Sequence, residues 1–133
     1  MKKKILIVED EESMLNSMRL ILKMADYKVE IARDGQEAFN KVMDSEEKGR
    51  QYDLIITDVL MPNLNGLEFL DKLNHEKLMI PVIAITGHAD KKMILKLILK
   101  GCDAYIIKPI EQDKLIDQVN YVFAEQINSK GFQ

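Results

Sequence analysis

Short apolar segments recur five times along the chain, with polar stretches between them. Each is four residues long and rich in β-branched side chains, which is typical of a β-strand. Three of the five are continuously apolar, as strands covered on both faces of a sheet usually are. The predicted strands are Ile5–Val8, Val29–Ala32, Leu54–Thr57, Val82–Ile85 and Ala104–Ile107.

The segments between and after these strands show helical periodicity. Apolar residues recur at intervals of three and four, which places them on one face of a helix. The stripes are Met14, Met18, Ile21, Leu22 and Ala25; Ala38, Phe39, Val42 and Met43; Leu67, Leu70 and Leu73; and Leu115, Val119, Val122 and Phe123. The polar stretch from Asp44 to Tyr52 is expected to fray the second helix into a loop. Strand and helix thus alternate five times, which predicts an α/β fold with a parallel sheet, right-handed crossovers and helices on both faces.

The composition is that of an ordinary globular protein. A chain of 133 residues is most simply one domain, and it can bury roughly two-thirds of the surface that its unfolded form exposes. Its 47% hydrophobic content is too high for a disordered chain. With a net charge of -3 and scattered lysines, the chain alone is not expected to bind nucleic acid. We expect a domain over residues 1–127 and a polar C-terminal tail over residues 128–133.

The sequence predicts a cytoplasmic protein. Cys102 is the only cysteine, which excludes a disulfide framework and a CxxC metal site and fits a reducing compartment. We expect it to be a small buried side chain. The apolar run near the amino terminus is four residues long, too short for a signal peptide. No run approaches the roughly 18 apolar residues that span a bilayer.

Polar side chains follow four of the five predicted strands. Glu9 and Asp10 come after the first strand, Asp58 after the third, Thr86 after the fourth and Lys108 after the fifth. Ligands of an open parallel sheet bind at the carboxyl ends of its strands. Each residue alone has an ordinary explanation as a turn residue, a helix cap or a surface lysine. Their joint placement instead predicts one functional site.

Three carboxylates at one edge of a sheet repel one another. At about 4 Å and an effective dielectric near 20, each pair costs roughly 4 kcal/mol. A hard divalent cation with oxygen ligands would offset that cost, and Mg²⁺ is usually held by one or two carboxylates, waters and a phosphate. Lys108 could pair with Asp58 or with a phosphoryl oxygen.

These residues resemble the receiver domain of two-component response regulators, including the single-domain chemotaxis type. The motifs are VED after the first strand, ARDGQEAF into the second helix, DLIITDVLMPNLNGLEFL around the third strand, VIAITGHAD and GCDAYIIKPI. The resemblance covers the chain from KILIVEDEE to the helix that is expected to end near Ile127. It implies a flavodoxin-like, doubly wound, five-stranded parallel sheet of order 2-1-3-4-5, with five helices on both faces.

The resemblance also implies a phosphoacceptor. Asp58 would attack a phosphohistidine on a histidine kinase or a histidine phosphotransfer protein and form an acyl phosphate. Thr86 and Lys108 would each contact a phosphoryl oxygen. A cis peptide bond between Lys108 and Pro109 is expected, which only X-Pro bonds make inexpensive. Phosphoryl transfer runs through a loose transition state, so alignment and charge neutralisation suffice for these roles.

A Mg²⁺ cofactor follows from the same resemblance. Asp10 and Asp58 would ligate the ion, Glu9 would act through water, and the backbone carbonyl of Leu60 would complete the protein ligands. In the family the positions of Leu60 and His88 flank the water that attacks the phosphoryl group. Because Leu60 cannot orient water by hydrogen bonding, we predict a long-lived acyl phosphate.

A switch and a partner surface complete the expectations. Phosphorylation would draw Thr86 inward, and Tyr105 would turn into the space that it leaves. The segment from Asp90 to Gly101 is apolar on more than one side, and such helices are usually buried or bound. One stripe, expected to pack against the sheet, consists of Leu95, Ile98, Leu99 and Cys102. We therefore predict that Ile94, Leu97 and Tyr105 form an output or homodimer face; the alternative is that they complete the core.

Three other functions fit the residues less well. An aspartyl-nucleophile phosphatase needs a second Asp at position 60, where Leu60 stands. A flavin-binding module needs a phosphate-cradling loop after the first strand, where EDEE would repel a phosphate. A degenerate receiver that acts as a phosphorylation-independent scaffold would not need every phosphorylation residue. We thus expect a signalling domain rather than an enzyme, either as a stand-alone regulator or within a longer protein.

Overall fold

The structure, a computed structural model, alternates strictly between strands and helices and describes residues 2–61, 63–87 and 90–131. The strands are β1 (Lys4–Val8), β2 (Lys28–Ala32), β3 (Leu54–Asp58), β4 (Val82–Thr86) and β5 (Ala104–Ile107). The helices are α1 (Glu12–Met24), α2 (Gly35–Glu47), α3 (Gly66–His75), α4 (Lys91–Leu99) and α5 (Gln112–Gly131). Every predicted strand is confirmed to within one residue at either end.

All strand pairs are parallel, and the sheet has the order β2-β1-β3-β4-β5. Strand β1 pairs with β2 on one side and β3 on the other, so that Leu6 lies opposite Glu30 and Ile55. The chain order reverses between β1 and β3, where the crossovers leave toward opposite edges of the sheet. The predicted flavodoxin-like, doubly wound topology is confirmed.

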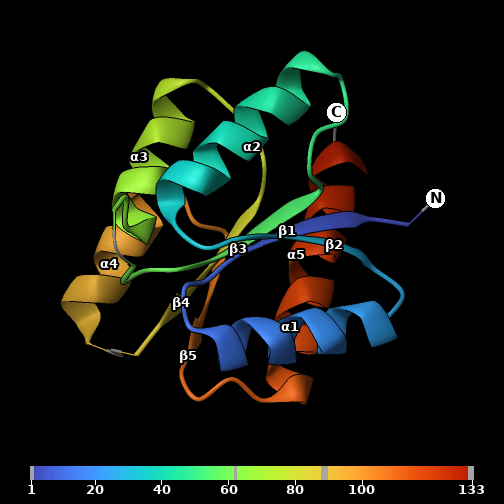
Figure 1. The fold of residues 1–133 in the computed structure, drawn as a ribbon, viewed down its shortest axis with the longest axis vertical. Coiled ribbons are helices and arrows are strands. Elements are labelled where there is room, and N and C mark those ends of the chain that lie inside the picture. The colour runs from blue at the N-terminus through green and yellow to red at the C-terminus, as the bar shows by residue number, and fades with distance from the viewer. Residues whose placement is uncertain (1, 62, 88–89, 132–133) are drawn as a thin grey trace.

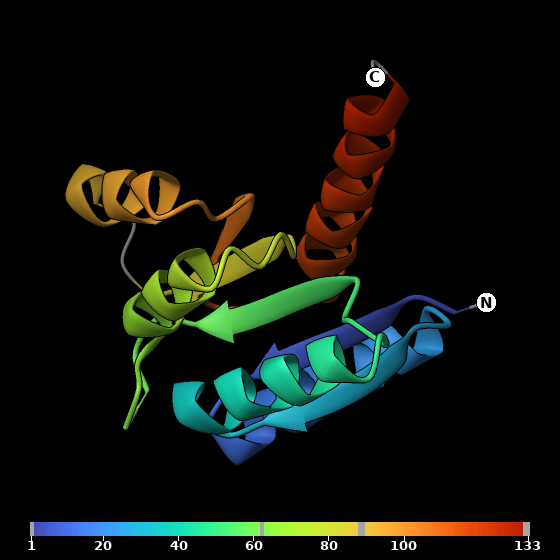
Figure 2. The same ribbon diagram turned by 90° about the horizontal axis from the view of Figure 1, so that it is seen from above.

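The strands are apolar on both faces because helices cover both (Figure 1). Successive side chains of a strand point to opposite faces, so Leu6 and Val8 pack toward α2 and α3, whereas Ile5 and Ile7 pack toward α1 and α5. Both cores are fully buried along these strands. In Figure 2 the last turns of α5 project beyond the rest of the fold.

Two helices run further than the sequence indicates. α2 continues through Asp44 to Glu47, supported by a Lys48 to Asp44 ion pair of 2.9 Å one turn apart, and Gly49 then takes a φ of 66° that ends it. α5 continues from the predicted end near Ile127 to Gly131, so most of the expected tail is helical. None of the described helices is long and apolar enough to cross a bilayer.

The face of α4 that packs inward is not the predicted one. Leu97 is fully buried and Ile94 is half-buried. Of the stripe that was expected to be buried, Cys102 is half-buried against the core, but the three α4 residues are exposed. Their exposed fractions are 56% for Leu95, 56% for Ile98 and 76% for Leu99. The prediction of Leu97 as a partner-face residue is therefore wrong. Because α4 is apolar around most of its circumference, its periodicity could not decide which stripe packs against the sheet.

Candidate functional site

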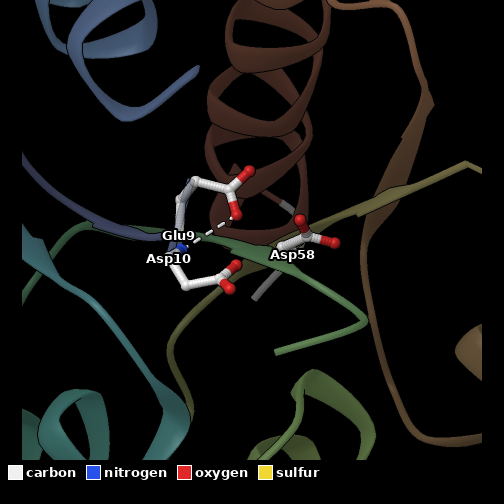
Figure 3. Close-up of side chains that lie close together, drawn as sticks. All are labelled: Glu9, Asp10 and Asp58. Carbon is white, nitrogen blue, oxygen red and sulfur yellow. Dashed lines mark hydrogen bonds between the residues drawn. The ribbon is translucent and has the colours of Figure 1, made fainter. Parts of the chain in front are cut away.

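The carboxylates of Glu9, Asp10 and Asp58 meet at the carboxyl end of the sheet. Glu9 and Asp10 follow β1, Asp58 is the last residue of β3, and these strands are neighbours. One ligand atom from each residue lies within 4.8 Å of the other two. Figure 3 shows the three side chains lying close together. The predicted convergence of the strand ends is confirmed for this acidic cluster.

Two of the three acids are shielded from water. Glu9 is fully buried and Asp58 is 3% exposed, whereas Asp10 is exposed. Glu9 Oε2 accepts a hydrogen bond of 3.0 Å from the backbone N–H of Asp10. Glu9 Oε1 is also buried but has no hydrogen-bond partner among the described residues. A buried oxygen without a partner is costly, so it points to a ligand or a proton that completes the site.

Burial raises the pKa of Glu9 to about 8, and the hydrogen bond and charge of Asp58 add to the rise. The nearby charge of Lys108 acts in the opposite direction. Near neutral pH a large part of the Glu9 population therefore holds a proton. A divalent cation would remove the need for that proton, because it supplies the missing positive charge.

Lys108 provides the positive charge of the cluster. It follows β5, and its Nζ donates a hydrogen bond of 2.8 Å to Asp58 Oδ2. Burial alone would lower the pKa of Lys108, but the hydrogen bond and charge of Asp58, with Glu9 and Asp10, raise it overall. The peptide bond between Lys108 and Pro109 is cis, as expected. Lys108 is thus a charged ammonium group that contacts the nucleophile predicted from the sequence.

Thr86 and Tyr105 lie on adjacent strands beside this cluster. Thr86 is the last residue of β4, 2% exposed, and its carbonyl accepts a hydrogen bond of 2.9 Å from the Lys108 N–H. Tyr105 is half-buried on β5 opposite Ala84. Its side chain lines a hollow of about 450 Å³ together with Ile98 of α4 and Tyr121 of α5. The aromatic ring therefore borders the outer surface of α4, β5 and α5.

The loop after β3 places the backbone of Leu60 next to the acids. The Leu60 N–H donates a hydrogen bond of 3.2 Å to Asp58 Oδ1. The Leu60 side chain is 62% exposed, so the main chain is the part of this residue that faces the site. His88, which was paired with Leu60 in the prediction about acyl phosphate lifetime, lies outside the described residues.

The donor set fits a hard divalent cation. The available atoms are carboxylate oxygens, one from each acid within 4.8 Å of the other two, and Glu9 Oε1 has no hydrogen-bond partner among the described residues. Oxygen ligands and few protein carboxylates are what Mg²⁺ prefers.

Contacts behind the site were missed by the sequence reasoning. Asn63, in the loop after β3, donates a hydrogen bond of 2.8 Å to the Asp34 side chain at the start of α2. Gly35 N–H donates one of 2.9 Å to the Leu64 carbonyl. The Asp-Gly pair before an apolar stripe is a helix-start signal. The Asp-Gly pair does not indicate which distant loop these residues contact.

Comparisons with known proteins agree with this geometry. The model of the response regulator receiver domain matches residues 5–120. The response regulator ArlR of Staphylococcus haemolyticus is 35% identical over 122 residues, which cover 92% of this chain and 53% of that protein. The chain thus spans about half the length of the curated relatives that it matches.

Solved structures of similar proteins cover nearly the whole fold. A CheY-like receiver domain protein from Methanospirillum hungatei has a TM-score of 0.85 at 29% identity, covering 97% of this chain and 99% of that one. The chemotaxis protein CheY4 of Vibrio cholerae has a TM-score of 0.83 at 27% identity, covering 92% of this chain and 99% of that one.

Proposed function

This chain belongs to the response regulator receiver domain family, and from that premise we propose that it accepts a phosphoryl group on Asp58 from a phosphohistidine donor. The 2.8 Å contact between Lys108 and the buried Asp58 carboxylate carries the proposal. It sets an ammonium group beside a nucleophile that also faces Glu9 and Asp10. A receiver domain is a signalling phosphoacceptor rather than a conventional enzyme. Its function therefore depends on the phosphorylated form of the protein itself and not on a released product.

The transfer requires little covalent chemistry from the protein. An Asp58 oxygen forms a bond to phosphorus while the bond between phosphorus and the imidazole nitrogen of the donor breaks, and the imidazole leaves with its electron pair. Lys108 contacts the Asp58 carboxylate and would stabilise negative charge on the phosphoryl oxygens. The Thr86 hydroxyl, at the end of the adjacent strand, is proposed to bond another of these oxygens.

Magnesium is the proposed cofactor. Asp10 and Asp58 would hold it, Glu9 would act through water, and the Leu60 carbonyl would complete the protein ligands. When bound, Mg²⁺ supplies charge neutralisation and alignment of the phosphoryl oxygens. The proposed donor is a histidine kinase or a histidine phosphotransfer protein, and the proposed location is the cytoplasm, which suits a chain with one half-buried cysteine, Cys102.

We further propose that phosphorylation changes the surface formed by α4, β5 and α5. Thr86 would move toward the phosphoryl group and Tyr105 would turn inward, which alters the hollow between Ile98 and Tyr121. Ile98 is 56% exposed and Tyr121 is 53% exposed, so this surface offers apolar area to an output partner or a second copy. It replaces the predicted face that included the buried Leu97.

Phosphorylation can be tested with acetyl phosphate and Mg²⁺. The parent chain is expected to gain about 80 Da by intact mass spectrometry, the mass of one phosphoryl group, and Asp58→Asn is expected to gain nothing. Asp53→Asn is a matched control, because Asp53 lies just before β3, at the amino-terminal end of the strands, where its side chain accepts a hydrogen bond from the Lys4 N–H. An unchanged mass in the parent would support the alternative, a phosphorylation-independent scaffold.

The output surface has its own test. Ile98→Lys is expected to abolish any change in light scattering that beryllofluoride and Mg²⁺ induce in the parent. Leu20→Lys, which places the same charge at a 61% exposed position of α1, is expected to leave the change intact. If both variants behave like the parent, the surface of α4, β5 and α5 is not the one that changes association.

A further inference from the structure

The loop between β3 and α3 is tied to the start of α2 by a side-chain pair. Asn63 has a φ of 64°, a left-handed conformation that Asn tolerates better than most residues. Its Nδ2 donates to Asp34 Oδ2 at 2.8 Å. Asp34 Oδ1 meanwhile accepts a hydrogen bond of 2.8 Å from the Glu37 N–H and caps α2. One carboxylate therefore joins a helix start to a loop 29 residues further along the chain.

A backbone contact reinforces this tie. The Gly35 N–H donates to the Leu64 carbonyl at 2.9 Å. A Cβ at position 35 would lie 2.1 Å from that carbonyl oxygen, a separation that no side chain tolerates. Glycine is thus required for the close approach of the two segments. The hydrogen bonds from Glu37 and Asn63 also lower the pKa of Asp34, so its charged form is the one that holds the loop.

The other end of the loop is tied to the phosphoacceptor itself. The Leu60 N–H donates to Asp58 Oδ1 at 3.2 Å, and the Gly66 N–H donates to the Val59 carbonyl at 2.9 Å. A Cβ at position 66 would lie 2.3 Å from the Asp58 carbonyl oxygen. The described parts of the loop are therefore anchored to the Asp58 carboxylate through Leu60 and to the start of α2 through Asn63 and Leu64.

We propose that Asn63 and Asp34 are positioning residues, whose hydrogen bond holds the loop so that the Leu60 backbone and the Asp58 carboxylate are preset for Mg²⁺. This inference rests on the proposed function, because it concerns the same metal. A loop that is already ordered loses less conformational entropy when the ion binds, so the chain binds Mg²⁺ more tightly. Neither residue touches the ion, so both act through the loop.

The test compares Mg²⁺ binding by calorimetry in three chains. Asn63→Gly keeps the left-handed backbone but removes the amide donor. The double variant Asp34→Asn with Asn63→Asp exchanges donor and acceptor, so that the new amide at position 34 donates to the new carboxylate at position 63. The new amide oxygen can still cap α2, and the summed charge of the pair is that of the parent. Lys77→Gly, at another left-handed position with a φ of 56°, controls for added backbone freedom.

Asn63→Gly is expected to bind Mg²⁺ about three- to tenfold more weakly than the parent, the range that corresponds to one hydrogen bond. The exchanged pair is expected to bind within about twofold of the parent. Lys77→Gly is expected to bind like the parent. Urea unfolding in EDTA, run beside each titration, separates lost affinity from lost stability, because a purely structural role would lower stability without changing the affinity of the folded chain.

Two results would overturn the inference while the proposed function stands. One is parent-like Mg²⁺ affinity in Asn63→Gly, and the other is an exchanged pair that binds as weakly as Asn63→Gly. If the parent chain itself binds no Mg²⁺, the proposed function fails and this inference fails with it.

Discussion

Neutralising Glu9 is expected to stabilise the metal-free protein at high pH. Glu9 is fully buried and lies beside Asp58, and one of its carboxylate oxygens has no hydrogen-bond partner in the part of the chain that the structure describes. In the substitution Glu9→Gln the side chain keeps its shape but carries no charge. Its amide can donate to Asp58, as a protonated Glu9 would, and the chain no longer has to bury a second anion there.

The sign and size of the effect follow from the pKa of Glu9, which rises from 4.5 to about 8 on folding. Between these values the folded chain holds a proton that the unfolded chain has released, so the free energy of unfolding falls as the pH rises. At about 1.36 kcal/mol for each unit of pKa, the full loss approaches about 5 kcal/mol. Water entry and relaxation of the pocket reduce it, and we expect about 2 to 4 kcal/mol.

Urea unfolding in EDTA at pH 5.5, 7.0 and 8.5 measures this loss. The parent chain is expected to lose stability across the series relative to Glu9→Gln, with no further relative loss above about pH 8. Glu47→Gln, an exposed acid on α2, controls for the change in net charge and is expected to follow the parent. Mg²⁺ at 100 times its dissociation constant should return about 2.7 kcal/mol to the parent. Identical pH profiles for parent and Glu9→Gln would refute the reasoning.

Two further predictions concern the groups around Asp58. Lys108→Met is expected to slow phosphorylation by acetyl phosphate about tenfold to a hundredfold, because the ammonium group at 2.8 Å no longer offsets negative charge; a parent-like rate in a mass-spectrometric time course would contradict its role. Gly66→Ala is expected to lower the free energy of unfolding by about 1 to 3 kcal/mol, because its Cβ would lie 2.3 Å from the Asp58 carbonyl oxygen. Gly87→Ala, whose added carbon has no atom of the described, non-adjacent residues within 4 Å, is the control in the same urea titration, and equal losses in the two variants would show that this close contact is not the cause.

The strands and the acidic cluster were predictable because local and long-range requirements agree there. A four-residue apolar run such as Ile5–Val8 is too short for a helix, and as a strand it is buried on both faces of the sheet. The parallel sheet then fixes where the carboxyl end of the strand lies. Glu9 and Asp58 consequently had to meet once β1 and β3 were neighbours. The sheet order itself came from the family resemblance, since alternation alone permits other orders.

The orientation of α4 and the tie between Asn63 and Asp34 were not predictable from local patterns. On α4, lysines interrupt an apolar surface that extends around the helix, so hydrophobic periodicity favoured the stripe with Ile98 over the one with Leu97. Packing against β4 and the α3 side of the core determines that Leu97 is the buried residue. The Asn63 contact joins segments 29 residues apart through one exposed side chain, and such a pair leaves no periodic trace in the sequence.

The excess negative charge that destabilises the metal-free site is also what would allow it to bind a cation. Glu9, Asp10 and Asp58 bring three negative charges when ionised, and Lys108 returns one, which leaves two in a largely buried space. A proton on Glu9 lowers the deficit to one, and a divalent cation removes it entirely. The proposed phosphorylation of Asp58 would then exchange one negative charge for nearly two, and the excess would reappear beside Thr86 and Lys108. A pocket with fewer acids would be more stable without metal, but it would neither hold the cation nor register the added charge as strongly.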